Sequence, residues 1–121
     1  MIKDSEKIGA IMVVGSGIAG IQASLDLANS GMKVYLVDNE ISIGGVMAQL
    51  DKTFPTNDCS ACILSPKLVE VGRHPNVEIL TRRTVKSVEG EPGKFKVKLL
   101  KAPRFVDLSK CTGCGDCAKV C

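Results

Sequence analysis

Apolar runs and a helical pattern alternate over the first forty residues of the chain. Residues 10–14 form a continuous apolar run, which is typical of a strand buried on both faces of a parallel sheet. Apolar residues then recur at helical spacing over residues 18–30, and residues 34–37 form a second apolar run. The pattern predicts a β-α-β unit in which a helix joins two parallel strands.

The next part of the chain is a long irregular stretch, residues 39–64, and loops of this length are usually functional. A short helix is predicted to begin at Ser65-Pro66, because Ser is a good N-cap and Pro suits the first helical position. The helix is expected to end near His74-Pro75.

Three more strands are predicted after this helix. Residues 77–80 fit a third parallel strand, and residues 84–89 and 94–100 fit an antiparallel pair. In the last strand Phe95, Val97 and Leu99 alternate with lysines, so one face is expected to be buried and the other solvated.

A glycine motif fills the turn between the first strand and the first helix. Gly15, Gly17 and Gly20 form Gly-x-Gly-x-x-Gly, and Asp38 follows 21 positions after Gly17 at the end of the second strand. In this context the motif predicts a dinucleotide site, with the diphosphate at the helix N-terminus and the acid on the adenosine ribose. The alternative is a glycine turn in an α/β protein that binds no nucleotide.

A second glycine pair favours FAD over NAD at this site. Gly44 and Gly45 lie six and seven residues past Asp38. This pattern resembles the two-dinucleotide flavoproteins, in which a Gly-Gly pair after the acid supports FAD. We therefore expect Gly44 and Gly45 to shape the loop towards a flavin, with NAD as the alternative.

The end of the chain has the cysteine spacing C-x2-C-x2-C-x3-C, by which ferredoxin-type domains hold cubane iron–sulfur clusters. Three of these cysteines are predicted to ligate one [4Fe-4S] cluster and the fourth to ligate the next. Gly113 and Gly115 would let the backbone curl around the cluster. A structural zinc site is the alternative, although zinc sites usually use two separated pairs or include His. In chain order the predicted ligands are Cys111, Cys114, Cys117 and Cys121.

Cys59 and Cys62 form a separate C-x2-C pair in the irregular stretch. They could ligate a cluster completed by cysteines outside the chain. They could instead form a redox-active dithiol, because this spacing favours a lowered thiol pKa. They could also be inert buried thiols, since free cysteine often behaves as a small core residue.

Composition excludes several other classes of protein. The net charge of +3 and an aromatic content of 3% argue against nucleic-acid binding, and no apolar run is long enough to span a membrane. Four of the six cysteines have cluster spacing, which favours metal over disulfides in a reducing compartment. We expect a cytoplasmic protein.

Seven blocks of residues together resemble the A-subunit of heterodisulfide reductase. The resemblance implies FAD, several [4Fe-4S] clusters and a multi-subunit complex, with hydrogenase or formate dehydrogenase subunits as electron donors and ferredoxin as acceptor. It also implies flavin-based electron bifurcation, and a thioredoxin-reductase-like FAD domain interrupted by an inserted ferredoxin domain. The matching blocks are residues 13–23, 34–38, 43–45, 50–56, 58–64, 71–76 and 110–117.

The predicted fold is therefore α/β, with an incomplete Rossmann-type, thioredoxin-reductase-like FAD-binding domain over residues 8–104 that includes an antiparallel β pair. The start of a ferredoxin-type domain is expected over residues 105–121. The predicted function is electron transfer between FAD and [4Fe-4S] clusters in an oxidoreductase subunit, of which this chain is a fragment that is inactive alone. The alternatives are a pyridine-nucleotide disulfide oxidoreductase with Cys59 and Cys62 as its dithiol, and a non-catalytic nucleotide-binding fragment.

Overall fold

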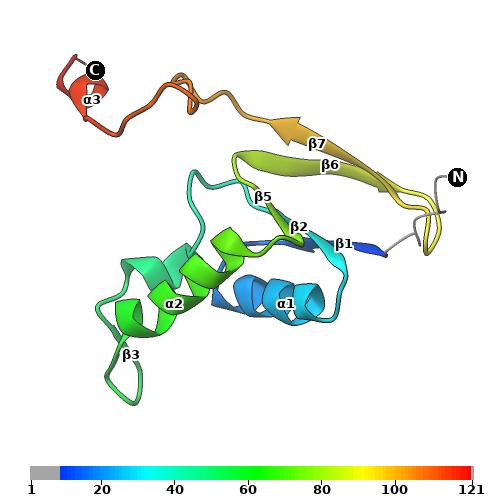
Figure 1. The fold of residues 1–121 in the computed structure, drawn as a ribbon, viewed down its shortest axis with the longest axis horizontal. Helices are drawn as coiled ribbons and strands as arrows, with labels where there is room; N and C mark the ends of the chain where they lie inside the picture. The colour runs from blue at the N-terminus through cyan, green and yellow to red at the C-terminus, as the bar shows by residue number, and fades with distance from the viewer. Residues whose placement is uncertain (1–8, 121) are drawn as a thin grey trace, which may run out of the picture.

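The structure is a computed structural model that describes residues 9–120 (Figure 1). In chain order its elements are β1 (Ala10–Val14), α1 (Ile18–Asn29), β2 (Lys33–Val37), the 3-10 helix η1 (Gly45–Gln49), β3 (Lys52–Thr53), β4 (Asp58–Cys59), α2 (Ser60–Arg73), β5 (Val77–Leu80), β6 (Arg83–Glu89), β7 (Lys96–Lys101) and α3 (Asp116–Val120). None of the helices in this described part is long and apolar enough to cross a membrane.

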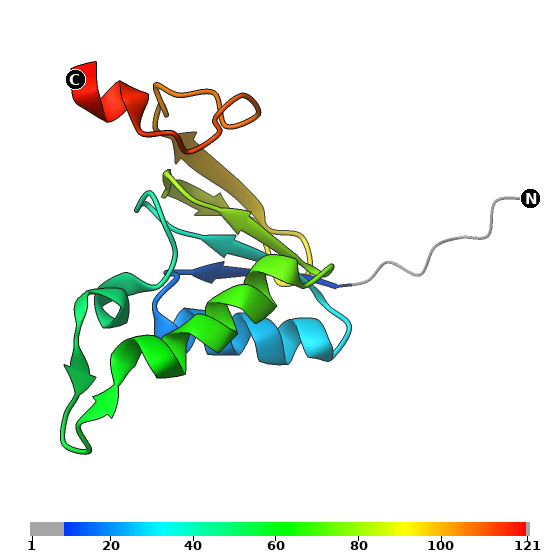
Figure 2. The ribbon, with the colours of Figure 1, turned by 60° about the vertical axis from the view of Figure 1, so that its left-hand side comes forward.

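A parallel sheet with the strand order β1-β2-β5 lies at the centre of the fold. Its registers pair Val14 with Val37 and Val37 with Leu80, so the three strands end at one edge of the sheet. The predicted β-α-β unit and the third parallel strand are confirmed. Figures 1 and 2 show α1 and α2 on one side of this sheet and the β6–β7 pair on the other.

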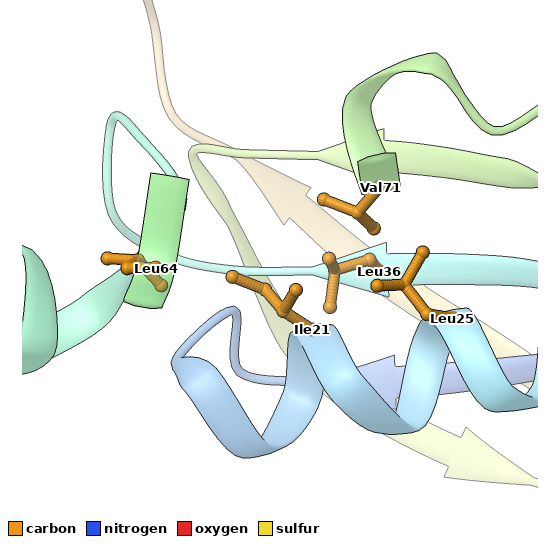
Figure 3. Packing of buried hydrophobic residues seen from close by; sticks show 5 residues of the cluster. All are labelled: Ile21, Leu25, Leu36, Leu64 and Val71. Atoms are coloured by element: carbon orange, nitrogen blue, oxygen red, sulfur yellow. The ribbon is translucent and has the colours of Figure 1, made fainter. Parts of the chain in front are cut away.

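The core lies between the two helices and the central strand (Figure 3). Ile21 and Leu25 come from α1, Leu36 from β2, and Leu64 and Val71 from α2, and each is at most 2% exposed. Burying an aliphatic side chain of this size stabilises a fold by about 1.5–3 kcal/mol. This cluster fixes both helices against the sheet.

Helix α2 begins six residues earlier than predicted, with Ser60 rather than Pro66 as its first residue. Cys59 is its N-cap, and Pro66 lies inside the helix. The prediction was wrong because a proline inside a helix, which costs about 3 kcal/mol, is outweighed here by packing. Leu64 and Val71 stand on either side of Pro66 and are both buried in the core, which needs one continuous helix.

The irregular stretch contains η1 and a small hairpin, β3–β4, in which Lys52 pairs with Cys59. The fully buried Ser60 joins these pieces to α2. Its hydroxyl donates to the Met47 carbonyl oxygen at 2.5 Å, and its N–H donates to the Asp51 carbonyl oxygen at 3.1 Å. The segment is therefore held to the start of α2 by two hydrogen bonds at one residue.

The predicted antiparallel pair is confirmed as β6–β7, with Arg83 opposite Lys101 and Glu89 opposite Lys96. The predicted burial holds only in part. Val97 and Leu99 are half-buried, whereas Phe95 is exposed, because β7 begins one residue after it. Residues 105–120, which include α3, are all exposed.

Gly20 makes the closest contact between α1 and the turn that follows β1. A Cβ built at Gly20 would overlap the carbonyl oxygen of Gly15. This overlap with backbone cannot be relieved by a side-chain rotation, so the helix can approach the strand only with glycine at this position.

We expect Gly20→Ala to destabilise the protein that carries this segment by about 1–3 kcal/mol or more, because an added methyl group must displace backbone. Gly72→Ala is the matched control: an added Cβ there meets no atom within 4 Å. The control should raise stability by about 0.4–1 kcal/mol, because it restricts the unfolded chain. Denaturant unfolding of both variants measures the difference, and equal effects at the two positions would contradict this packing.

Candidate functional site

The N-terminus of α1 presents backbone N–H groups that the helix itself cannot use. Gly17 is the N-cap, and no side chain caps this end. The first intrahelical bond runs from the Ile21 N–H to the Gly17 carbonyl oxygen at 2.9 Å. The preceding amides of the first turn therefore have no acceptor within the helix, and such an end attracts anions. The predicted glycine motif therefore lies at a helix end of the kind that attracts anions, and its role towards a diphosphate stays a prediction.

Gly44 and Gly45 lie directly against this turn. The Gly44 N–H donates to the Ser16 carbonyl oxygen at 2.8 Å, and a Cβ at Gly45 would come within 2.9 Å of the Gly17 Cα. Only a glycine lets the loop after β2 approach so closely. The structure thereby brings the Gly44-Gly45 pair against the glycine motif, from which it is distant in the sequence. The role of the pair towards a flavin stays a prediction.

Asp38 follows β2 at the same edge of the sheet and is bonded to the glycine turn. One of its carboxylate oxygens accepts from the Ser16 N–H at 2.6 Å and from the Ser16 hydroxyl at 2.5 Å. The other oxygen accepts from the Glu40 N–H at 2.9 Å. These hydrogen bonds fix the side chain beside the start of α1.

These hydrogen bonds also set the ionisation of Asp38. Desolvation by partial burial raises the pKa of the carboxyl group, but hydrogen bonds from Ser16, Glu40 and Asn39 together hold the pKa below its usual 3.8. The group is consequently an anion at neutral pH and a strong hydrogen-bond acceptor.

Ser16 is a site residue that sequence reasoning missed. It is fully buried, and both its N–H and its hydroxyl bind Asp38, 22 residues away. It occupies the variable position between Gly15 and Gly17, so the motif itself carries no signal for it. A small hydroxyl residue at that position, with an acid after the next strand, is the pattern that could have indicated the contact.

Cys59 and Cys62 lie at the N-terminus of α2 and are disulfide-bonded, with their Cα atoms 5.3 Å apart. The Cys59 sulfur also accepts from the Cys62 N–H at 3.3 Å. Both residues are exposed, so the interpretation as buried, inert thiols is wrong. An exposed pair at a helix N-terminus is suited to thiol exchange or, once reduced, to metal ligation.

Three of the four C-terminal cysteines, Cys111, Cys114 and Cys117, are exposed free thiols. Gly113 and Gly115 have φ angles of +73° and +80°, so the backbone curls between these cysteines as expected. Within residues 9–120 no three ligating side chains are gathered around one point. Cys121 lies outside the described residues. The donor set itself, thiolates at this spacing, is the one that cubane clusters use.

Two family models match this chain and together cover residues 9–121. The pyridine nucleotide-disulphide oxidoreductase family matches residues 9–110, and the 4Fe-4S binding domain family matches residues 104–121. They support FAD and a [4Fe-4S] cluster as cofactors. The uncapped helix end beside Asp38 fits the first cofactor, and the thiolate donor set fits the second.

Several curated relatives are similar over most of this chain. A protein from Archaeoglobus profundus, named as similar to the A-subunit of heterodisulfide reductase, is 62% identical over 111 residues, which is 92% of this chain and 16% of that protein. An iron-sulfur A-subunit of CoB–CoM heterodisulfide reductase from Methanopyrus kandleri is 56% identical over 98% of this chain and 18% of its own length. The chain thus spans less than a fifth of these relatives.

Solved structures show the same fold. L-proline dehydrogenase from P. horikoshii matches with a TM-score of 0.60 and 25% identity, covering 80% of this chain and 20% of that one. Thioredoxin reductase from T. acidophilum also has a TM-score of 0.60, at 20% identity, over 74% of this chain and 30% of its own. The thioredoxin-reductase-like fold is confirmed. The chain belongs to the pyridine nucleotide-disulphide oxidoreductase family, and its resemblance to the A-subunit of heterodisulfide reductase is confirmed at 56–62% identity.

Proposed function

We propose that this chain is part of an oxidoreductase subunit that passes electrons between FAD and [4Fe-4S] clusters in a heterodisulfide-reductase-like complex. The observation that carries the proposal is the combination, in one chain, of a dinucleotide turn bonded to Asp38 and a run of cluster-type cysteines. A nucleotide-binding fragment without redox function would have no need of the second feature.

The geometry suggests how this chain holds the flavin nucleotide. The free amides after Gly17 bind the diphosphate, and Gly45 keeps the neighbouring loop close enough to enclose it. Asp38 accepts hydrogen bonds from the adenosine ribose, whose hydroxyls join or replace the Ser16 hydroxyl. Gly15 and Gly20 allow the turn and the helix to take their positions.

The cysteine run holds the second redox group. Cys111, Cys114 and Cys117 ligate one [4Fe-4S] cluster, and Cys121 ligates the next. A flavin exchanges one or two electrons and a cluster exchanges one, so the pair can connect two-electron to one-electron chemistry. The chain's own contribution is to hold the two groups at a fixed separation. We place the boundary between the two domains after residue 104.

The relatives' names suggest the wider setting. Proteins from Methanothermobacter marburgensis and Methanococcus maripaludis are named as the A-subunits of an H(2):CoB-CoM and an H(2)/formate:CoB-CoM heterodisulfide,ferredoxin reductase, respectively. For the whole protein we propose a cytoplasmic complex with hydrogenase or formate dehydrogenase subunits as donors, ferredoxin as acceptor and electron bifurcation at the flavin. The 121-residue chain is inactive alone in this proposal.

The state of the central cysteine pair favours a second role, that of a redox dithiol. Cys59 and Cys62 are bonded to each other and exposed, and Cys62 borders an apolar hollow on the outer side of α2. A disulfide that is accessible at a helix N-terminus can exchange with an external thiol. This role adds disulfide chemistry to the electron transfer proposed above.

We expect Asp38→Asn to weaken FAD binding about 10- to 100-fold, because a hydrogen bond to a charged group is worth about 1.5–3 kcal/mol. Asp26→Asn, on the exposed side of α1, is the control and should leave the affinity unchanged. Flavin fluorescence titration of the deflavinated full-length protein measures both. An unchanged dissociation constant for Asp38→Asn would contradict the ribose contact.

Iron content distinguishes the role of the Cys59/Cys62 pair from that of the C-terminal cysteine run. Replacing both Cys59 and Cys62 with Ser should leave iron unchanged and remove two titratable thiols from the reduced protein. Cys111→Ser should lower iron by about four per chain, the content of one cubane. Iron loss from the Cys59/Cys62 double variant would show that the pair ligates a cluster, and full iron in Cys111→Ser would contradict the cluster assignment.

A further inference from the structure

The turn between β5 and β6 is bonded to the loop that carries Asp38. The Asp38 N–H donates to the Leu80 carbonyl oxygen at 3.1 Å, and the Asp38 carbonyl oxygen accepts from the Arg83 N–H at 2.8 Å. The Arg82 N–H donates to the Glu40 carbonyl oxygen at 2.9 Å. The acid and the β5–β6 turn therefore form one hydrogen-bonded unit.

The same turn holds the segment that leads to the cysteine run. The Arg82 carbonyl oxygen accepts from the Ala102 N–H at 2.8 Å, and the Arg82 guanidinium donates to the Pro103 carbonyl oxygen at 3.0 Å. In the reverse direction, the Arg104 guanidinium donates to the Thr81 hydroxyl. Residues 102–104 are thus joined to residues 81–82 by main-chain and side-chain bonds.

Beyond this point the described chain has no further anchor. Ala102 and Arg104 are half-buried, whereas every residue from 105 to 120 is exposed. The hydrogen bonds of residues 105–120 within the described structure are to one another or to Arg104. Figure 2 shows this segment leaving the end of β7 on the side of the sheet away from the helices.

Arg82 occupies a backbone conformation that favours glycine. Its φ angle is +57°, in the left-handed region that costs a residue with a Cβ about 1–2 kcal/mol. Glycine would adopt it without strain but would bring no guanidinium. Part of the side chain is buried, because its Nε is shielded from solvent and has no hydrogen-bond partner among the described residues. What arginine adds at this position is the contact with Pro103.

We propose that Arg82 is a positioning residue for electron transfer, connecting the Asp38 loop to the segment that carries the cysteine run. This inference rests on the function proposed above. With both cofactors bound, reduced FAD would lose one electron and an oxidised [4Fe-4S] cluster would gain it. Arg82 takes no part in that chemistry. It fixes the direction in which residues 102–104 leave the flavin-binding half, and this direction sets the distance between FAD and the cluster.

The test compares three variants of the full-length subunit in its complex. Arg82→Gly removes the guanidinium and relieves the backbone, and Arg82→Lys keeps a donor for the Pro103 carbonyl oxygen. Asn57→Gly is the matched control, since Asn57 also has a left-handed φ of 58° but lies in the β3–β4 hairpin. For each protein, FAD and iron content, melting temperature and the rate of cluster reduction after rapid flavin reduction are measured.

Arg82→Gly should keep FAD, iron and a melting temperature equal to or above that of the parent, while cluster reduction slows severalfold because the separation of the two redox groups is no longer fixed. Arg82→Lys should recover most of the rate, and Asn57→Gly should match the parent. An Arg82→Gly protein that transfers electrons at the parent rate, or that loses stability or cofactors, overturns the positioning role. A parent protein without FAD or iron overturns the proposed function itself.

Discussion

The two hydrogen bonds from Ser16 to Asp38 are the interaction on which the rest of the site depends. They join the turn after β1 to the end of β2, across 22 residues of sequence. Because Ser16 is fully buried, its two hydrogen bonds hold the carboxylate in a fixed position. In the same turn, the Ser16 carbonyl oxygen also accepts a hydrogen bond from the Gly44 N–H. One residue therefore organises the acid, the glycine turn and the loop that covers it.

Close backbone packing supports this interaction from both sides. Gly20 brings α1 against the carbonyl group of Gly15, and Gly45 brings the loop against Gly17. The apolar cluster of α1, α2 and β2 then holds both helices on the sheet. An anion-binding helix end and an anionic acceptor stand side by side as a result, and they suit the diphosphate and the ribose of an adenosine diphosphate group, respectively.

The sequence predicted the elements whose local signals agree with their surroundings. Residues 10–37 combine an apolar strand, a helical period and a glycine turn, and the β-α-β unit formed as expected. The prediction failed at Pro66, where a local rule for helix starts competed with core packing by Leu64 and Val71. Ser16 and Arg82 were missed because their roles depend on partners about 20 residues away that the fold brings near, and only Ser16 has a sequence pattern that could have indicated its contact.

The central claim is that Asp38 and the amides at the start of α1 hold the adenosine diphosphate part of FAD. The most direct measurement is an experimental structure of the FAD-loaded full-length subunit. Our proposal predicts ribose hydroxyl oxygens within hydrogen-bonding distance of the Asp38 carboxylate, and diphosphate oxygens within the same distance of the first-turn amides after Gly17. A flavin bound elsewhere, with Asp38 still bonded only to Ser16 and its backbone neighbours, would contradict it.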